Sequence, residues 1–161
     1  MDNATHNKLQ DLLSQVLQTE GTSMGLIRKF KPDDDELDIV CHQGFSDDFI
    51  EQFFSVKPFD HTSCGRAFGI GSTVLINDIE QDLSFKKQIR FLKELKVQFR
   101  SVKSAPVLTQ RGRKVGILSV FFEQPKWDWH FRPHDKLEQE IAEILFDLVN
   151  RDSERALSAG S

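Results

Sequence analysis

The sequence has no tyrosine, two cysteines and five prolines among its 161 residues. The two cysteines, Cys41 and Cys64, are too few for the disulfide framework of a small secreted domain, and they form no Cys-x-x-Cys pair. No run of about 18 apolar residues is present, and the first residues lack the basic and apolar segments of a targeting peptide. We therefore expect a cytoplasmic protein with reduced thiols and no membrane span.

Phenylalanine, in contrast, is abundant: there are 14 such residues, and 39% of the chain is hydrophobic. A chain of this length can form a core without a disulfide or a metal, so we expect one globular domain. Phenylalanine brings apolar area without a polar tip, and many of these rings must fill a core or a pocket. We place the domain at residues 1–151 and a flexible tail or linker at 152–161.

Positive charge is concentrated in one segment. Between Lys86 and Lys114 there are ten Lys and Arg residues and one acid, Glu94, although the whole chain has a net charge of −4. Such a segment either attracts anions or forms the solvated face of a helix and a turn. Aromatic residues are not interleaved with the charges as single-strand binding requires, so we expect no nucleic acid partner.

Two long helices are predicted near the ends of the domain. Leu9, Leu13 and Val16 belong to an apolar stripe at helical spacing, which ends at Gly21. A last helix is predicted to begin at Pro133, a residue favoured at the first helical position, and it is apolar on two sides. One side would pack on a sheet, which leaves the other for the first helix or for another subunit.

Short elements fill the region between these helices. Alternating or compact apolar patterns predict strands at 23–30, 36–42, 73–76, 99–109 and 114–123, and capping residues predict short helices at 46–54, 61–71 and 84–96. This order of elements predicts an α+β domain with an antiparallel sheet.

Four segments together resemble a GAF domain: DHTSCGRA at 60–67, GSTVLINDI at 71–79, RSVKSAPV at 100–107 and GILS at 116–119. The resemblance extends from about Leu9 to Arg151. It implies a PAS-like fold with a six-stranded antiparallel sheet, with terminal helices on one face and a ligand cavity under short helices on the other. It also implies a sensory or regulatory module for signal transduction, joined in a longer protein to an output domain of the kinase or cyclase type.

The resemblance also implies a set of pocket residues. Phenylalanine rings would form the apolar walls, small polar groups would orient a small molecule, and the basic segment favours an anionic one. Alternatively, the rings fill the cavity and nothing binds. The expected ligand-binding residues are Phe45, Phe59, His61, Thr62, Cys64, Gly65, Asp78, Phe85, Phe91, Ser101, Ser104 and Phe121.

Homodimerisation through the terminal helices is the second expectation. Ligand contacts that differ between two arrangements would shift their populations, and the helices would carry that shift to the dimer interface. A structural dimerisation module with a collapsed pocket is the alternative. The expected interface residues are Leu9, Leu13, Val16, Leu145, Leu148 and Val149.

Specialised branches of the family match less well. Phe131 to Asp135 supplies the F-x-x-x-D part of the cyclic-nucleotide pattern, but Lys136 stands where glutamate is expected, and 123–126 lacks the Asn-Lys pair. A covalent bilin would need a cysteine in 84–96, where none occurs. Cys64-Gly65 resembles the start of the pocket helix in free methionine sulfoxide reductases, but the cysteine expected in the loop at 82–85 is absent. We therefore expect no enzyme, with a thiol-dependent reductase as the alternative.

Metal ligation is not indicated either. His61-x-x-Cys64, Cys41-His42 and His130 with His134 offer donors, but Pro133 interrupts the helical face that an HxxxH pair needs. No GxSxG, HExxH or phosphate-binding glycine loop occurs. We expect no metal site and no catalytic residues, and we name no cofactor.

Overall fold

The computed structural model describes residues 1–129 and 134–159. Its strands are β1 (Met24–Lys31), β2 (Glu36–Gln43), β3 (Ser55–Val56), β4 (Val74–Ile76), β5 (Ser101–Leu108) and β6 (Lys114–Phe122). Its helices are α1 (Asn3–Glu20), α2 (Asp47–Gln52), α3 (Ser63–Ile70), α4 (Ile89–Glu94) and α5 (Asp135–Ala159). The strands form one antiparallel sheet in the order β3-β2-β1-β6-β5-β4. The expected α+β fold with six strands is confirmed.

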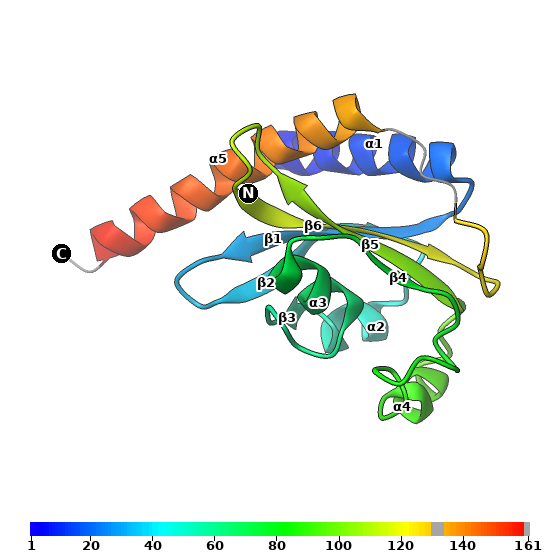
Figure 1. Cartoon of the computed structure of the whole chain (residues 1–161). Coiled ribbons are helices and arrows are strands. Elements are labelled where there is room, and N and C mark those ends of the chain that lie inside the picture. The colour runs from blue at the N-terminus through cyan, green and yellow to red at the C-terminus, as the bar shows by residue number, and fades with distance from the viewer. Residues whose placement is uncertain (130–133, 160–161) are drawn as a thin grey trace.

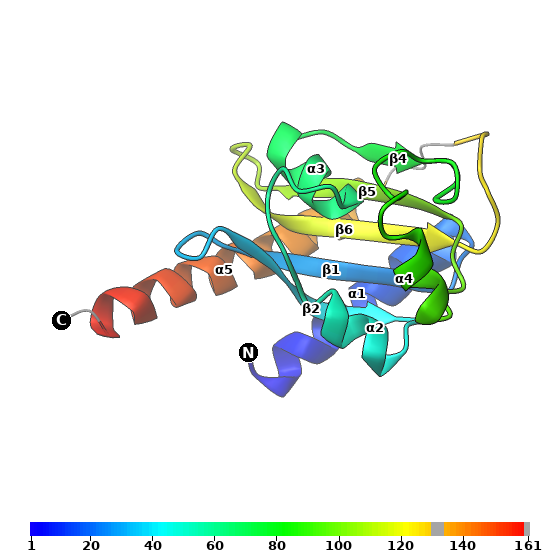
Figure 2. The same ribbon diagram turned by 90° about the horizontal axis from the view of Figure 1, so that it is seen from below.

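The sheet separates two layers of helices. Figure 1 shows α1 and α5 side by side on one face, and Figure 2 shows α2, α3 and α4 against the other. We call these the helix face and the pocket face. Successive strand residues point to opposite faces, so Leu26 of β1 packs in the pocket-face core while its neighbour Ile27 packs in the helix-face core.

The first helix has a clear start and end in the sequence. The Asp2 carboxylate accepts a hydrogen bond from the Thr5 amide at 2.7 Å, and Gly21 adopts the left-handed conformation at φ 77°. The Gly21 amide donates to the Leu17 carbonyl and closes the last turn. Between these caps, five apolar residues at helical spacing are buried against the sheet and α5.

A β-bulge shifts the alternation in β2. The register between β1 and β2 changes between Ile27 and Arg28, because Ile27 pairs with Cys41 whereas Arg28 pairs with Ile39. Strand β2 thus contains one extra residue, Val40, and the side chains beyond it point to the opposite faces from those that strict alternation would give. Cys41 therefore lies in the helix-face core, although strict alternation from Ile39 would place it on the pocket face.

Three predicted segments differ from the structure. Strand β3 has two residues, too few to produce a periodic signal, and was not predicted from the element pattern. The helix expected at 84–96 is limited to Ile89–Glu94, since 83–88 forms turns that begin where the Ser84 amide donates to the Asp82 side chain. Helix α5 continues to Ala159, through most of the segment expected to be a flexible tail. The predicted helix start at Pro133 lies outside the described residues.

The six residues expected in a dimer interface are instead buried inside one chain. Each has at most 6% of its surface exposed, because the apolar stripes of α1 and α5 pack against each other and the sheet. A dimer through these helices would have to use other side chains. Phe146 and Leu157 are exposed apolar residues of α5. None of the helices in the described part of the chain is long and apolar enough to cross a membrane.

Candidate functional site

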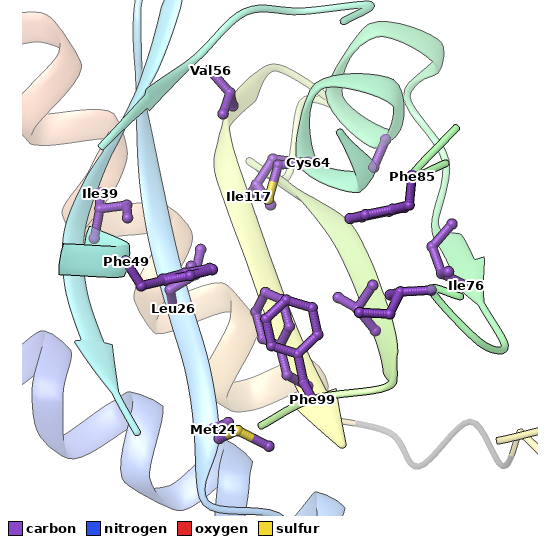
Figure 3. Close-up of a cluster of buried hydrophobic side chains, with 14 of the residues drawn as sticks. Met24, Leu26, Ile39, Phe49, Val56, Cys64, Ile76, Phe85, Phe99 and Ile117 are labelled. Atoms are coloured by element: carbon purple, nitrogen blue, oxygen red, sulfur yellow. The ribbon is translucent and has the colours of Figure 1, made fainter. Parts of the chain in front are cut away.

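A small cavity lies between the sheet and the short helices. Its volume is about 40 Å³, and five phenylalanines contribute to its wall. In Figure 3, Phe49 of α2 and Phe85 from the segment before α4 point inward from opposite sides of the surrounding core. The lining residues are Leu26, Arg28, Phe49, Phe53, Thr62, Ser63, Cys64, Phe85, Gln88, Leu92, Phe99 and Phe121.

Stacked and edge-on rings hold one side of this cavity. The rings of Phe45 and Phe49 stack with centroids 4.7 Å apart, and Phe99 meets Phe121 edge-on at 4.8 Å. Phe45 also contacts Phe121 at 5.0 Å, so it supports the wall from behind and does not line the space. Such contacts favour fixed ring positions, which gives the cavity a defined shape.

Four of the expected pocket residues line the cavity: Thr62, Cys64, Phe85 and Phe121. Thr62 is also the N-cap of α3, because its hydroxyl accepts a hydrogen bond from the Gly65 amide at 3.0 Å. Gly65 lies beneath the loop before α3, where a Cβ atom would come within 2.3 Å of the Lys57 carbonyl. Its role is therefore close packing of helix and loop, and it does not line the cavity.

Three other expected residues lie at the surface. Phe59 is 72% exposed and packs against Gly69 on the outside of α3. Phe91 is partly exposed, with its ring centroid 6.1 Å from that of Phe53. His61 is exposed and hydrogen-bonded to Gln88, which lines the cavity. Phe91 and His61 thus lie one residue away from the cavity wall.

Ser101 and Asp78 do not face the cavity. Ser101 lies three positions before Ser104, so the two-residue period of β5 places them on opposite faces of the sheet. The Ser101 hydroxyl donates to the Gln124 carbonyl at 2.7 Å. The Arg100 guanidinium binds both carboxylate oxygens of Asp78, at 3.0 and 2.9 Å, and this hydrogen bonding lowers the pKa of Asp78. Asp78 is therefore occupied by an internal ion pair.

Ser104 belongs to a buried cluster of hydroxyl groups under α3. Its oxygen lies 3.0 Å from that of Ser63 and 2.6 Å from that of Ser119. The Cys64 sulfur is 3.1 Å from the Ser119 oxygen. These contacts satisfy the hydroxyls by mutual hydrogen bonds and hold the start of α3 on β5 and β6.

The two thiols are in different environments. Cys64 lines the cavity, whereas Cys41 is buried on the helix face, where burial raises the pKa of its thiol to about 12. The sheet lies between them, so they are not placed to form a disulfide with each other. Within residues 1–129 and 134–159, no three His, Cys, Asp or Glu side chains gather as a metal site requires. His130 and the first residues of the cyclic-nucleotide pattern, Phe131 to Pro133, lie outside the described residues.

Arg28 is a cavity residue that the sequence analysis missed. It is 3% exposed and lies on the pocket face of β1, where Leu26 and Phe30 flank it on the same face. The sequence did contain a signal, because an arginine at this position interrupts an apolar series spaced by two residues. Alternation alone does not show whether such an arginine is buried on the inner face of the strand or exposed to solvent.

Wider hollows occur at the surface, away from this core. One of about 610 Å³ lies between the end of α1 and residues 122–128, and one of about 580 Å³ lies between the β5–β6 turn and α5. Both are broad and open. The cavity under the short helices is much smaller, but it combines aromatic walls with a buried charge.

Comparison with known proteins identifies the family of the chain. The sequence profile described as GAF domain matches residues 6–149. No curated protein matches the chain.

Several solved structures share the fold. The GAF domain region of a Geobacter sulfurreducens PCA protein is 21% identical, with a TM-score of 0.65 over 91% of this chain and 93% of that chain. Free methionine-R-sulfoxide reductase from Neisseria meningitidis, solved with its substrate, is 22% identical, with a TM-score of 0.58 over 94% and 82%. The GAF domain of an Acinetobacter phosphoenolpyruvate-protein phosphotransferase is 14% identical, with a TM-score of 0.54 over the full length of both chains. With its profile matched over residues 6–149 and its fold shared by these structures, the chain belongs to the GAF domain family.

Proposed function

We propose that this chain is a regulatory GAF domain that binds a small molecule in the cavity between its sheet and its short helices. The cavity itself carries the proposal, since it is lined by five phenylalanines and lies where a ligand would contact both the sheet and the short helices. Its volume of about 40 Å³ is far below the roughly 300 Å³ of small binding pockets. On this proposal, a ligand would have to widen the cavity in order to bind.

Opening is easiest at two of the three roof helices. Helix α3 packs closely on β4, β5 and β6, whereas α2 and α4 are six-residue helices with less extensive contacts to the sheet. Displacement of α2 and α4 would widen the cavity and leave the sheet unchanged. A ligand that binds the open form better would shift the population toward it.

Native mass spectrometry of protein purified without added ligand is the first test, followed by thermal shift against amino acids, carboxylates, cyclic nucleotides and tetrapyrroles. A ligand that binds only the folded form raises the melting temperature, by an amount that grows with ligand concentration. A co-purified mass or such a shift is the expected result. Absence of both would favour a structural module with a filled cavity.

A thiol-dependent reductase is the second candidate, because Cys64 lines the cavity and several structural neighbours are free methionine-R-sulfoxide reductases. The position of Cys41 weighs against it. A resolving thiol has to reach the attacking sulfur, and Cys41 is buried on the far side of the sheet. We therefore propose that the chain is not an enzyme. Turnover of free methionine sulfoxide with dithiothreitol that is lost in Cys64→Ser would contradict this.

Homodimerisation is proposed through the outer side of α5. Phe146 is 38% exposed and Leu157 is 76% exposed, and Figures 1 and 2 show the C-terminal part of α5 extending beyond the sheet. Leu157→Glu should convert a dimer into a monomer in analytical ultracentrifugation, while the exposed Leu83→Glu serves as the control on a different surface.

In a longer protein, helix α5 would connect to an output domain of the kinase or cyclase type. A cytoplasmic location fits the two buried free cysteines.

A further inference from the structure

Arg28 is buried without an opposite charge. Its Nη1 donates to the carbonyls of Leu37 and Phe54, at 3.2 and 3.1 Å. Its Nε is buried and has no hydrogen-bond partner. Among the described residues, no carboxylate forms an ion pair with it. The guanidinium therefore retains donor capacity that the protein does not use.

Two partly buried lysines on other parts of the sheet have a carboxylate partner, whereas Lys114 instead contacts the carbonyl and ring of Phe68. Lys103 pairs with Glu20, and Lys29 pairs with Asp152. A buried charge without a partner is costly, because it has lost its hydration and gained no compensating charge. Among the described residues, Arg28 is the only Lys or Arg that is fully buried, and it lies at the cavity.

The cavity wall fits one class of anion. Arg28 is the only charged side chain among its described lining residues, and no Lys or Arg of the basic segment at 86–114 reaches it. One positive charge balances one negative charge, whereas a phosphate dianion would leave an uncompensated charge among phenylalanine rings. A guanidinium can also bind both oxygens of a carboxylate through two parallel hydrogen bonds.

We propose that Arg28 binds the carboxylate of a small organic monoanion whose apolar part lies against the phenylalanines of the cavity. This inference rests on the proposed function and specifies the ligand class of the same site. The β-bulge beside Arg28 is consistent with it, since bulges are common where a strand has to aim a side chain into a site. Gln88 and Thr62, which also line the cavity, are the neutral polar groups available to such a ligand.

Matched ligands test this without any mutation. Acetate, propionate, benzoate and phenylacetate are each compared with the corresponding primary amide by thermal shift and calorimetry, and phenyl phosphate serves as the dianion. Hydrogen bonds to a charged group contribute about 1.5–3 kcal/mol, so we expect at least one carboxylate to bind roughly tenfold to a hundredfold more tightly than its amide. Equal affinity for acid and amide would overturn the inference but leave the proposed function standing. If no compound binds and no mass co-purifies, both fail.

Variants identify the residue responsible. Arg28→Met should remove the preference for carboxylate over amide, and Arg28→Lys should retain part of it. Arg90→Met is the control, because it removes the same charge from α4 at a side chain that is 93% exposed and does not line the cavity. We expect this variant to bind like the unmodified protein.

The melting temperature without ligand separates binding from a structural role. If Arg28 serves a ligand, Arg28→Met should melt at the same temperature as the unmodified protein or above it, since an unpaired buried charge is removed. The opposite result is a melting temperature that falls by several degrees in Arg28→Met, with the carboxylate preference retained in both variants. Arg28 would then have a structural role, as the donor to the carbonyls of Leu37 and Phe54. That outcome would overturn the inference.

Discussion

The two faces of the sheet are built from the same strands but differ in kind. The helix-face core is mostly aliphatic, covered by two long helices, and its buried residues are at most 6% exposed. The pocket-face core is rich in phenylalanine, covered by three short helices, and contains a cavity, a hydroxyl cluster and an unpaired arginine. Close packing stabilises the first face, whereas the second contains features that cost stability, as expected of the proposed binding site.

The largest expected effect is on the helix face. Leu145→Ala should lower the free energy of unfolding by about 2–5 kcal/mol, because it opens a void at a position with no exposed surface in the helix-face core. Phe85→Leu, at the edge of the existing cavity, should cost less, since the volume lost adjoins space that is already empty. Urea unfolding followed by circular dichroism measures both. A greater loss for Phe85→Leu would reverse our comparison of the two faces.

The next effect concerns the link between α1 and the rest of the molecule. Burial acts to raise the pKa of Glu20, but hydrogen bonds from His134 and Lys103 outweigh it and hold that pKa below its ordinary value of 4.5. His134 Nε2 lies 2.7 Å from the Glu20 carboxylate. Because the pKa of Glu20 is lower in the folded than in the unfolded state, its ionised carboxylate stabilises the protein at pH values above the ordinary pKa. This stabilisation is lost as the pH falls through the pKa of the folded state.

Glu20→Gln should therefore lower the free energy of unfolding at pH 7 by about 1–3 kcal/mol and flatten its decline in acid. Glu94→Gln, at a side chain that is 68% exposed, provides the control with the same charge change. Urea titrations at pH 7 and pH 3 measure the difference. If Glu20→Gln declines in acid as steeply as the unmodified protein, Glu20 is not the group responsible.

The smallest expected effect distinguishes the thiols. Both cysteines are buried, but Cys64 borders the cavity under the three short helices, whereas Cys41 lies beneath the two long helices. In native protein, an aromatic disulfide reagent should react with Cys64 about tenfold faster than with Cys41, because opening of the roof needs less unfolding. The single variants Cys41→Ser and Cys64→Ser assign the two rates. Faster reaction of Cys41 would mean that the helix face is the more mobile one.

Much of the fold could be predicted because local chemistry determines it. Gly21 ends α1 through a conformation that suits glycine, and Thr62 caps α3 as its side chain predicts. The order of the elements then defined the α+β class, and the resemblance supplied the sixth strand. These features depend on neighbours in the sequence, so a single sequence contains them.

The site was harder to predict because it depends on pairing between distant segments. The bulge opposite Ile27 decides which face Cys41 occupies, and nothing within β2 itself marks it. Ser101 and Ser104 were expected together, although their odd spacing on one strand places them on opposite faces. Arg28 was missed because it stands out only through its surroundings, where no carboxylate of the described residues pairs with it. Which residues surround a side chain depends on the fold and cannot be seen in a single sequence.

Arg28 and Lys29 are consecutive residues that point to opposite sides of the sheet. Arg28 reaches the cavity, and Lys29 is ion-paired with Asp152 in the C-terminal half of α5. In β1, a residue that lines the cavity is therefore directly followed by a residue that binds α5. If a ligand binds Arg28 as proposed, a displacement of this part of β1 would be passed to α5 through the ion pair between Lys29 and Asp152.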